Sequence, residues 1–336
     1  MMKFKGMKVL EVNDDCLLGV KGYSLVKYDF LQKKIIPYAK VIDNKYAPLS
    51  KFYLLRRLLR AEITGLYTLS DGTQLVIAKK GIFRKEKNDD SFIKTFAVLR
   101  GSRPLNLCIA SDGKIYFGEY FANMEKKAVR IFLSEDNGRV WTVACTIDAG
   151  RINHIHGLFW DKYTKRLWIC TGDREGECII GYTEDGFQTL VEVFRGGQEY
   201  RTCHLFFYEQ YIVFATDSEY TENEIKFFDR ETLQIDVLQK IQGTAIKGGQ
   251  CGEIAFISTT VEPSKINKDT FSHLWITKDG LNWEEVYKAE KDILPHIFQF
   301  GSIEFPRYRI SKPLKKLFFS GRALKDIDGC SLSIDI

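Results

Sequence analysis

Two histidines separated by a single residue are the first place where this sequence could carry out chemistry. His154 and His156 lie in the segment 151–157, which is predicted to begin a β-strand. Side chains two residues apart in a strand share a face. Such a pair can act as a base with an electrostatic partner, or bind a metal with a third ligand such as His204. The alternative is two half-buried histidines bonded to the backbone.

Acidic residues follow three apolar strand-like segments in the same part of the chain. Glu119 ends the segment 116–119 and is followed by Tyr120, while Asp173 follows 168–172 and Asp217 follows 214–216. Glycine before Asp173 lets the backbone turn and presents the carboxylate at the end of the sheet. We therefore expect these groups to lie at equivalent positions of neighbouring sheets.

Two arginines near these segments are candidates for binding an anionic ligand. Arg201 precedes His204 in the segment 196–204, and Arg103 stands in Ser-Arg-Pro at 102–104. The planar guanidinium suits a carboxylate, such as that of an acidic sugar. The alternative for Arg201 is an ordinary ion pair with Asp173 or Asp217.

Together these residues predict a site that acts on a glycan. Carboxylates with a tyrosine and an arginine suit glycoside hydrolysis, whereas histidine, tyrosine and arginine suit β-elimination from a uronic acid. The residue types leave both reactions open. The expected catalytic residues are His154, His156, Asp173, Glu119 and Tyr120, and the expected substrate-binding residues are Arg103, Arg201, His204 and Asp217.

The elements that must position these residues are indicated by a repeated phrase. Ser-Glu-Asp-Asn-Gly-Arg-Val-Trp at 134–141 returns in altered form at 183–187 and 277–283, spacings close to one and two times 48 residues. Short segments rich in β-branched and aromatic residues alternate with Asp-Gly turns. A period of this size over 336 residues predicts a single all-β domain, 1–336. We expect a β-propeller of seven four-stranded blades, with six as the alternative.

The repeated phrase resembles the Asp-box, or BNR repeat, of sialidase-like β-propellers. The phrase at 134–141 matches the family pattern in full, and those at 183 and 277 are shortened variants. The resemblance implies the fold and a site at the central funnel. The family's Arg-Ile-Pro signature is missing; only Ser102-Arg103-Pro104 is similar to it. A sialidase-like glycosidase, a polysaccharide or oligosaccharide lyase, and a non-catalytic propeller that binds a glycan or a protein therefore stay open.

The remaining features of the sequence concern a short helix, the closure of the ring, the charge and the expected location of the protein. A short helix is expected near 50–62, capped by Ser50, with Phe52, Leu55, Leu58 and Leu59 on its packed side. The N-terminal strand is expected to complete the last sheet. The net charge is +5, and acidic and basic residues are mixed along the chain, so the charge does not indicate nucleic acid binding. We expect a cytoplasmic protein without a membrane span, without a cofactor, and with a glycan or oligosaccharide ligand.

Overall fold

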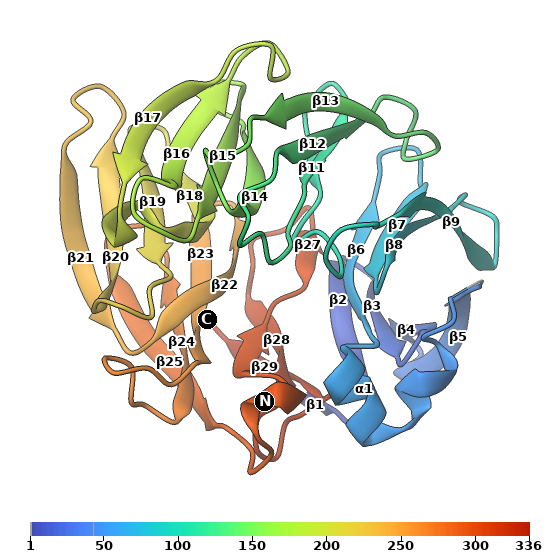
Figure 1. Cartoon of the computed structure of the whole chain (residues 1–336). Coiled ribbons are helices and arrows are strands. Elements are labelled where there is room, and N and C mark those ends of the chain that lie inside the picture. The colour runs from blue at the N-terminus through green and yellow to red at the C-terminus, as the bar shows by residue number, and fades with distance from the viewer. Residues whose placement is uncertain (1, 43) are drawn as a thin grey trace.

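The computed structural model describes residues 2–42 and 44–336, and these form seven four-stranded antiparallel sheets around a central axis (Figure 1). Each sheet is one blade of a β-propeller, as predicted. The strands of the first three blades, from the axis outwards, are β2 (Lys8–Asn13), β3 (Cys16–Lys21), β4 (Ser24–Asp29) and β5 (Lys34–Val41); β6 (Ile63–Thr68), β7 (Gln74–Ala78), β8 (Gly81–Lys85) and β9 (Ser91–Ala97); and β10 (Cys108–Ile109), β11 (Ile115–Gly118), β12 (Val129–Ser134) and β13 (Thr142–Ile147).

The fourth to seventh blades follow the same pattern. Their strands are β14 (His154–Asp161), β15 (Arg166–Gly172), β16 (Cys178–Thr183) and β17 (Val191–Gly196); β18 (Thr202–Phe207), β19 (Tyr211–Thr216), β20 (Asn223–Asp229) and β21 (Ile235–Ile241); β22 (Thr244–Cys251), β23 (Ile254–Val261), β24 (Phe271–Thr277) and β25 (Trp283–Glu290); and β26 (Gly301–Glu304), β28 (Lys316–Arg322), β29 (Ser331–Asp335) and β1 (Met2–Phe4).

The two ends of the chain close the ring in the seventh blade. The N-terminal strand β1 pairs with β29, with Met2 opposite Ser333, so it supplies the outermost strand as expected. The short strand β27 (Arg307–Arg309) runs parallel to β2 and links the seventh blade to the first. Closure of this kind joins the first and last blades, so that the sheet of the seventh blade contains both ends of the chain.

The core consists of apolar layers between neighbouring blades. Between the fourth and fifth blades, for example, Trp168 and Phe207 pack together with their ring centroids 6.4 Å apart. Phe214 is fully buried in the same layer. Burying a side chain of this size stabilises the fold by roughly 1.5–3 kcal/mol. These layers hold the inner strands, and therefore the side chains at their ends, in fixed positions.

The repeated phrases form the turns between the third and fourth strands of three blades. In the first, the Ser134 hydroxyl donates to Asp136 Oδ1 at 2.8 Å, and the same oxygen accepts the Val140 N–H at 2.9 Å. Thr183 with Asp185 and Thr277 with Asp279 repeat the hydroxyl-to-carboxylate bond. Strands alternate in direction within a blade, so these turns lie at the opposite end of the propeller from the point where the second strands end.

The helical insertion is shorter than expected and buries a different face. It consists of a 3-10 turn, Pro48–Lys51, and the helix α1 (Tyr53–Leu59), which Phe52 precedes without a side-chain cap. The prediction of a Ser50 cap and of a packed stripe through Leu55 and Leu58 was wrong. Those two leucines are exposed, while Arg57 is buried.

The burial of Arg57 has a clear cause in distant partners. Its Nη1 donates to Asp292 Oδ2 at 2.5 Å and its Nε to the Phe298 carbonyl at 2.7 Å, next to the 3-10 turn η3 (His296–Phe298). An arginine whose donors are paired in this way can be buried.

Within residues 2–42 and 44–336, no helix has the length and apolarity needed to cross a membrane.

Candidate functional site

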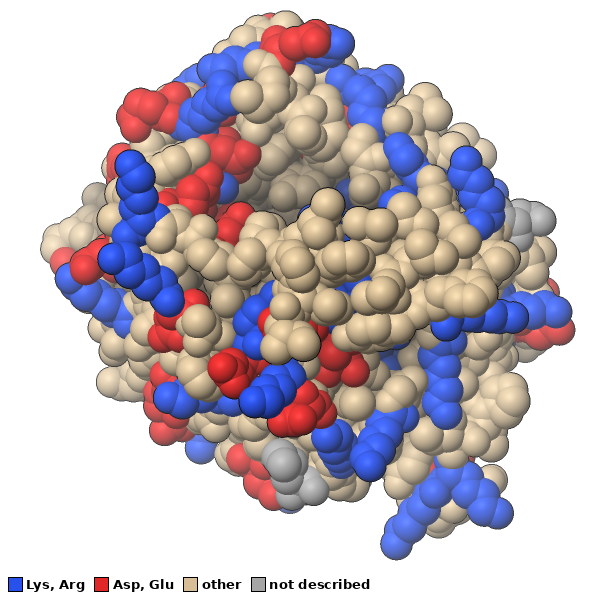
Figure 2. Space-filling model, turned by 60° about the horizontal axis from the view of Figure 1, so that its bottom comes forward, with Lys and Arg blue, Asp and Glu red and all other residues tan. Residues whose placement is uncertain are grey.

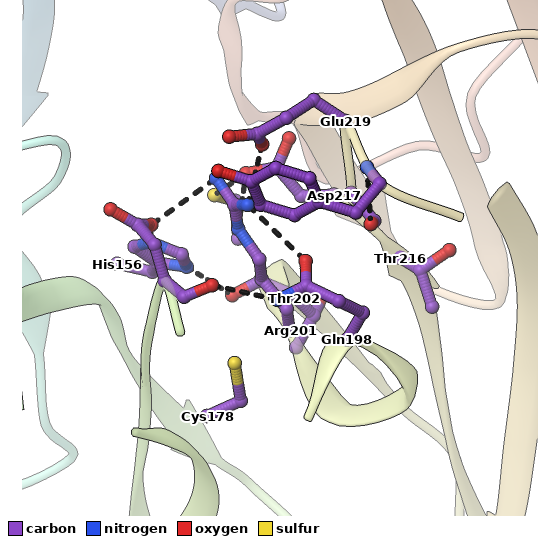
Figure 3. Close-up of polar contacts among 12 residues, drawn as sticks. His156, Cys178, Gln198, Arg201, Thr202, Thr216, Asp217 and Glu219 are labelled. Atoms are coloured by element: carbon purple, nitrogen blue, oxygen red, sulfur yellow. Dashed lines mark hydrogen bonds and ion pairs between the residues drawn. The ribbon is translucent and has the colours of Figure 1, made fainter. Parts of the chain in front are cut away.

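The candidate site lies at one end of the central channel, between the fourth and fifth blades. Inner strands begin at this end and second strands return to it. Therefore His154 at the start of β14, Asp173 just after β15, Arg201 just before β18 and Asp217 just after β19 come together. Figure 3 shows His156, Arg201 and Asp217 of this group. Figure 2 shows this end as a hollow with acidic side chains along one side.

The two histidines of the pair face each other and are fixed by backbone carbonyls. His154 is 5% exposed and His156 is 2% exposed. His154 Nδ1 lies 3.0 Å from the Phe121 carbonyl oxygen, and His156 Nδ1 lies 3.0 Å from that of Thr202. The two Nε2 atoms are 3.1 Å apart. The shared face expected for these residues is therefore present.

Asp173 completes this group. Its Oδ1 lies 2.9 Å from His156 Nε2 and 3.4 Å from His154 Nε2, while its Oδ2 accepts the Asn153 amide at 2.7 Å. Burial alone would raise the pKa of this carboxyl, but the bonds with the two histidines outweigh burial and hold its pKa well below the usual range. Burial lowers the pKa of His156.

Arg201 connects this group to further carboxylates. Its Nη2 lies 3.2 Å from Asp173 Oδ1, its Nη1 lies 2.6 Å from Glu219 Oε2, and its Nε lies 3.9 Å from Asp217 Oδ2 (Figure 3). Burial would lower the pKa of the guanidinium, yet Asp217 and Asp173 raise it above its usual range. The ion pairs with Asp173 and Asp217 that were the alternative for Arg201 are thus present. Carboxylates of the protein itself contact the guanidinium.

Asp217 is a buried acid beside a buried thiol. It is 4% exposed, its Oδ2 lies 3.2 Å from Cys203 Sγ, and its Oδ1 has no partner among the described residues. Burial raises the pKa of Asp217 to about 7 although Arg201 opposes the shift. Burial and this carboxylate also raise the pKa of the Cys203 thiol well above its usual value. Asp217 can therefore carry a proton near neutral pH.

Tyr120 lies against the histidine pair. Its ring centroid is 4.3 Å from that of His154 and 6.4 Å from that of His156. Burial raises the pKa of the phenol, and the nearby Cys203 and Asp217 raise it further. The phenol is therefore protonated at neutral pH and can donate that proton.

Three of the predicted residues lie outside this group. Glu119 is paired with Arg100, whose Nε is 2.9 Å from its Oε1, and with Arg130 at 3.0 Å. His204 packs between Phe159 and Phe206, and burial lowers its pKa to about 3.

Arg103, the third of these residues, lies across the channel in another cluster. Its Nη2 is 3.9 Å from Glu62 Oε1, and Glu62 also pairs with Arg322 at 2.9 Å. Burial and Arg322 lower the pKa of Arg103 to about 10. The structure therefore separates two predicted arginines that we expected to act on one ligand.

The sequence prediction did not include Asn153, Cys203 or Glu219. Asn153 immediately precedes the histidine pair, and Cys203 is two residues after Arg201, a spacing that puts two side chains on one face of a strand. That signal was available in the sequence. Glu219 follows the strand end at Asp217 by two residues and offered no comparable signal.

A cavity of about 500 Å³ extends from this group along the axis, and residues from the innermost strand of every blade line it. His156 and Cys203 contribute to its wall. Four cationic side chains and one carboxylate also line it: Lys8, Lys162, Lys247, Arg307 and Glu304. The wall is therefore positively charged and attracts anions.

Comparisons with known proteins define the class of fold. No model of a known protein family matches the chain, and no curated protein matches it. A chain of the mitotic checkpoint complex has a TM-score of 0.59 at 9% identity, with 100% of this chain and 93% of that chain covered. A chain of a nidogen/laminin complex has a TM-score of 0.53 at 12% identity, with 85% and 96% covered.

A third match is the GH74 enzyme of Niastella koreensis. Its TM-score is 0.55 at 11% identity, over 84% of this chain and 45% of that chain. At such identities the likeness concerns the fold alone. The protein is a β-propeller, and its structural neighbours include both an enzyme and components of protein complexes.

Proposed function

We propose that this protein cleaves an acidic glycan by β-elimination at the mouth of its channel. One observation carries the proposal: the positively charged cavity leads to the group of His154, His156 and Asp173, with Tyr120 beside it. An acidic polysaccharide is attracted by such a wall. The basic group and the Tyr120 hydroxyl, which is the acid, then lie where the polysaccharide would enter the channel.

The reaction needs one proton removed and one delivered. The group of His154, His156 and Asp173, or a water molecule that it holds, takes the proton from the carbon next to the uronate carboxylate. The bond from the adjacent carbon to the glycosidic oxygen breaks and a carbon–carbon double bond forms. The Tyr120 hydroxyl gives its proton to the departing oxygen and recovers one from the basic group.

The carboxylates favour elimination over hydrolysis. Hydrolysis requires two carboxyl groups that flank the scissile bond. Glu119 is occupied by two arginines, and Asp217 lies beneath Cys203 with 4% of its surface exposed. Asp173 is thus the one carboxyl group of the predicted set that is both near the histidines and partly exposed. We also propose that the three turns are Asp-boxes. This assignment concerns the fold and does not depend on the reaction.

A panel of oligosaccharides containing uronic acids tests the proposal. We expect an increase in ultraviolet absorbance from the new conjugated double bond. Tyr120→Phe should lower kcat by about 10² to 10⁴-fold, the usual contribution of a general acid. Tyr182→Phe, a tyrosine of the fourth blade that packs on Trp168 away from the histidine pair, is the control and should leave kcat unchanged. New reducing ends without the absorbance change would refute elimination.

The second candidate function is binding without catalysis. The burial of His156 and Asp217 favours it, because both offer little surface to a substrate. A binder would hold an acidic oligosaccharide, with no product formed, and Tyr120→Phe would leave its affinity nearly unchanged. Calorimetry of the same panel separates this function from the first.

A further inference from the structure

The geometry points to a divalent metal site, most suited to Zn²⁺, formed by His154 Nε2, His156 Nε2 and Asp173 Oδ1. We infer this from which atoms carry protons. Both Nδ1 atoms lie 3.0 Å from carbonyl oxygens, which only accept hydrogen bonds. Both Nδ1 atoms must therefore be protonated, and in a neutral imidazole the lone pair is then on Nε2.

Three lone pairs consequently face one another. The Nε2 atoms are 3.1 Å apart, and Asp173 Oδ1 lies 2.9 and 3.4 Å from them. With both imidazoles neutral, none of the three atoms can donate a hydrogen bond to another. A cation between them, either a proton on one of the two rings or a metal ion, resolves this arrangement.

The spacing fits a metal ion. Zn²⁺ binds histidine nitrogen and carboxylate oxygen at roughly 2.0–2.2 Å in tetrahedral geometry, so its ligand atoms are about 3.4 Å apart. The three separations found here, 2.9–3.4 Å, are at or slightly below that value. Two histidines and one carboxylate leave a fourth position open, the arrangement of catalytic zinc sites.

The surroundings of the three atoms also match those of metal ligands. Metal-bound histidines usually donate their other N–H to a carbonyl or carboxylate, and metal-bound carboxylates are themselves hydrogen-bonded. Here the carbonyls of Phe121 and Thr202 hold the rings, and the Asn153 amide holds Asp173 Oδ2 at 2.7 Å. These contacts orient all three donors toward one point.

Charge favours the same occupant. Arg201 is the one arginine in this group, and three carboxylates surround it: Asp173, Asp217 and Glu219. Its Nη1 and Nη2 atoms are engaged by Glu219 and Asp173, and an excess of acidic groups remains to stabilise a cation. The catalytic consequence rests on the proposed function: the metal would supply the positive charge beside the uronate carboxylate, the water molecule held by the group would take the proton in place of the three ligands, and Tyr120 would give its proton to the departing oxygen.

Direct metal binding tests the inference without any glycan. Protein stripped with a chelator is titrated with Zn²⁺ by calorimetry and with Co²⁺ by visible absorption. We expect one equivalent per chain and the absorption bands of a tetrahedral site with nitrogen and oxygen ligands. A wild-type protein that binds neither ion, or that gives only the spectrum of hydrated Co²⁺, overturns the inference whether or not any variant folds.

Variants locate the ion. His156→Gln and Asp173→Asn should each weaken Zn²⁺ binding at least about 100-fold, since they remove a ligand, and Asn153→Ala should weaken it about 10-fold. His204→Gln is the matched control, because this histidine of the same channel lies outside the group, and it should bind normally. Full affinity in both ligand variants overturns the assignment. Activity without bound metal refutes only this inference, whereas bound metal without activity refutes only the proposed function.

Discussion

Replacement of Arg201 by methionine probes the electrostatic balance of the site most sharply. Arg201 is 8% exposed and is in contact with Asp173 at 3.2 Å, Glu219 at 2.6 Å and Asp217 at 3.9 Å. Methionine keeps much of the volume and removes the charge. Breaking a buried ion pair by removing one partner typically costs about 3–5 kcal/mol, because a buried charge remains unpaired.

The loss should depend on pH in a definite direction. The pKa of Asp217 is about 7 in the folded protein with Arg201 present, and removal of the cation raises it further. At pH 6 the folded variant therefore keeps Asp217 protonated and neutral, whereas at pH 8 the carboxyl is closer to ionisation. We expect about 3–5 kcal/mol of destabilisation at pH 8 and a smaller loss at pH 6.

Urea unfolding of wild type and Arg201→Met at the two pH values measures both losses. The control is Arg195→Met, which removes an exposed partner of Glu192 and should change stability by less than about 1 kcal/mol. The double variant Arg201→Met/Asp217→Asn should recover part of the loss at pH 8. A loss below about 1 kcal/mol, or an equal loss at both pH values, would refute the reasoning.

Three further predictions concern other parts of the propeller. The pKa of His204 is about 3 in the folded protein and about 6.5 in the unfolded chain, so between these pH values the unfolded chain binds an extra proton. The stability of the wild type should therefore fall as the pH drops from 6.5 to 3. His204→Phe should remove part of this pH dependence in thermal melts. A Cβ at Gly172 would lie 2.4 Å from His156 Cε1, so Gly172→Ala should weaken Zn²⁺ binding while circular dichroism stays that of the wild type. Asp136→Ala loses the bonds of a turn far from the mouth and should cost about 1–2 kcal/mol in urea unfolding with kcat unchanged.

The blade architecture could be predicted because it repeats along the chain. The phrase at 134–141 and its variants all fall between the third and fourth strands of a blade, so their spacing measures the blade itself. The pairing of the N-terminal strand with the last sheet was predicted as well, and β1 pairs with β29. Local turn chemistry and a fixed period carry this information in the sequence.

The candidate site could be predicted only in part. The strand period placed His154 and His156 on one face. Asp173, just after β15, and Arg201, just before β18, lie at the same end of the propeller and contact this pair or each other. The same period would have placed His204 on the face opposite Cys203, where it packs between two phenylalanines. The position of Glu119 follows from Arg100 and Arg130, which no spacing rule connects to it.

The helix illustrates a limit of local patterns. Its spacing predicted a packed side of Phe52 and leucines, but Arg57 is the residue that is buried, because Asp292, 235 residues away, supplies its partner. A pair at that separation is created by closure of the ring. Amphipathic spacing describes a helix against an apolar surface, and α1 instead meets a charged one.

The central claim is that the mouth between the fourth and fifth blades binds and cleaves an acidic glycan. A crystal structure of Tyr120→Phe soaked with a uronic acid oligosaccharide and Zn²⁺ tests it most directly. The account predicts a sugar carboxylate beside His154, His156 and Asp173, with anomalous signal from one ion between their facing atoms. Sugar bound only at another surface, with this group unoccupied, would contradict it.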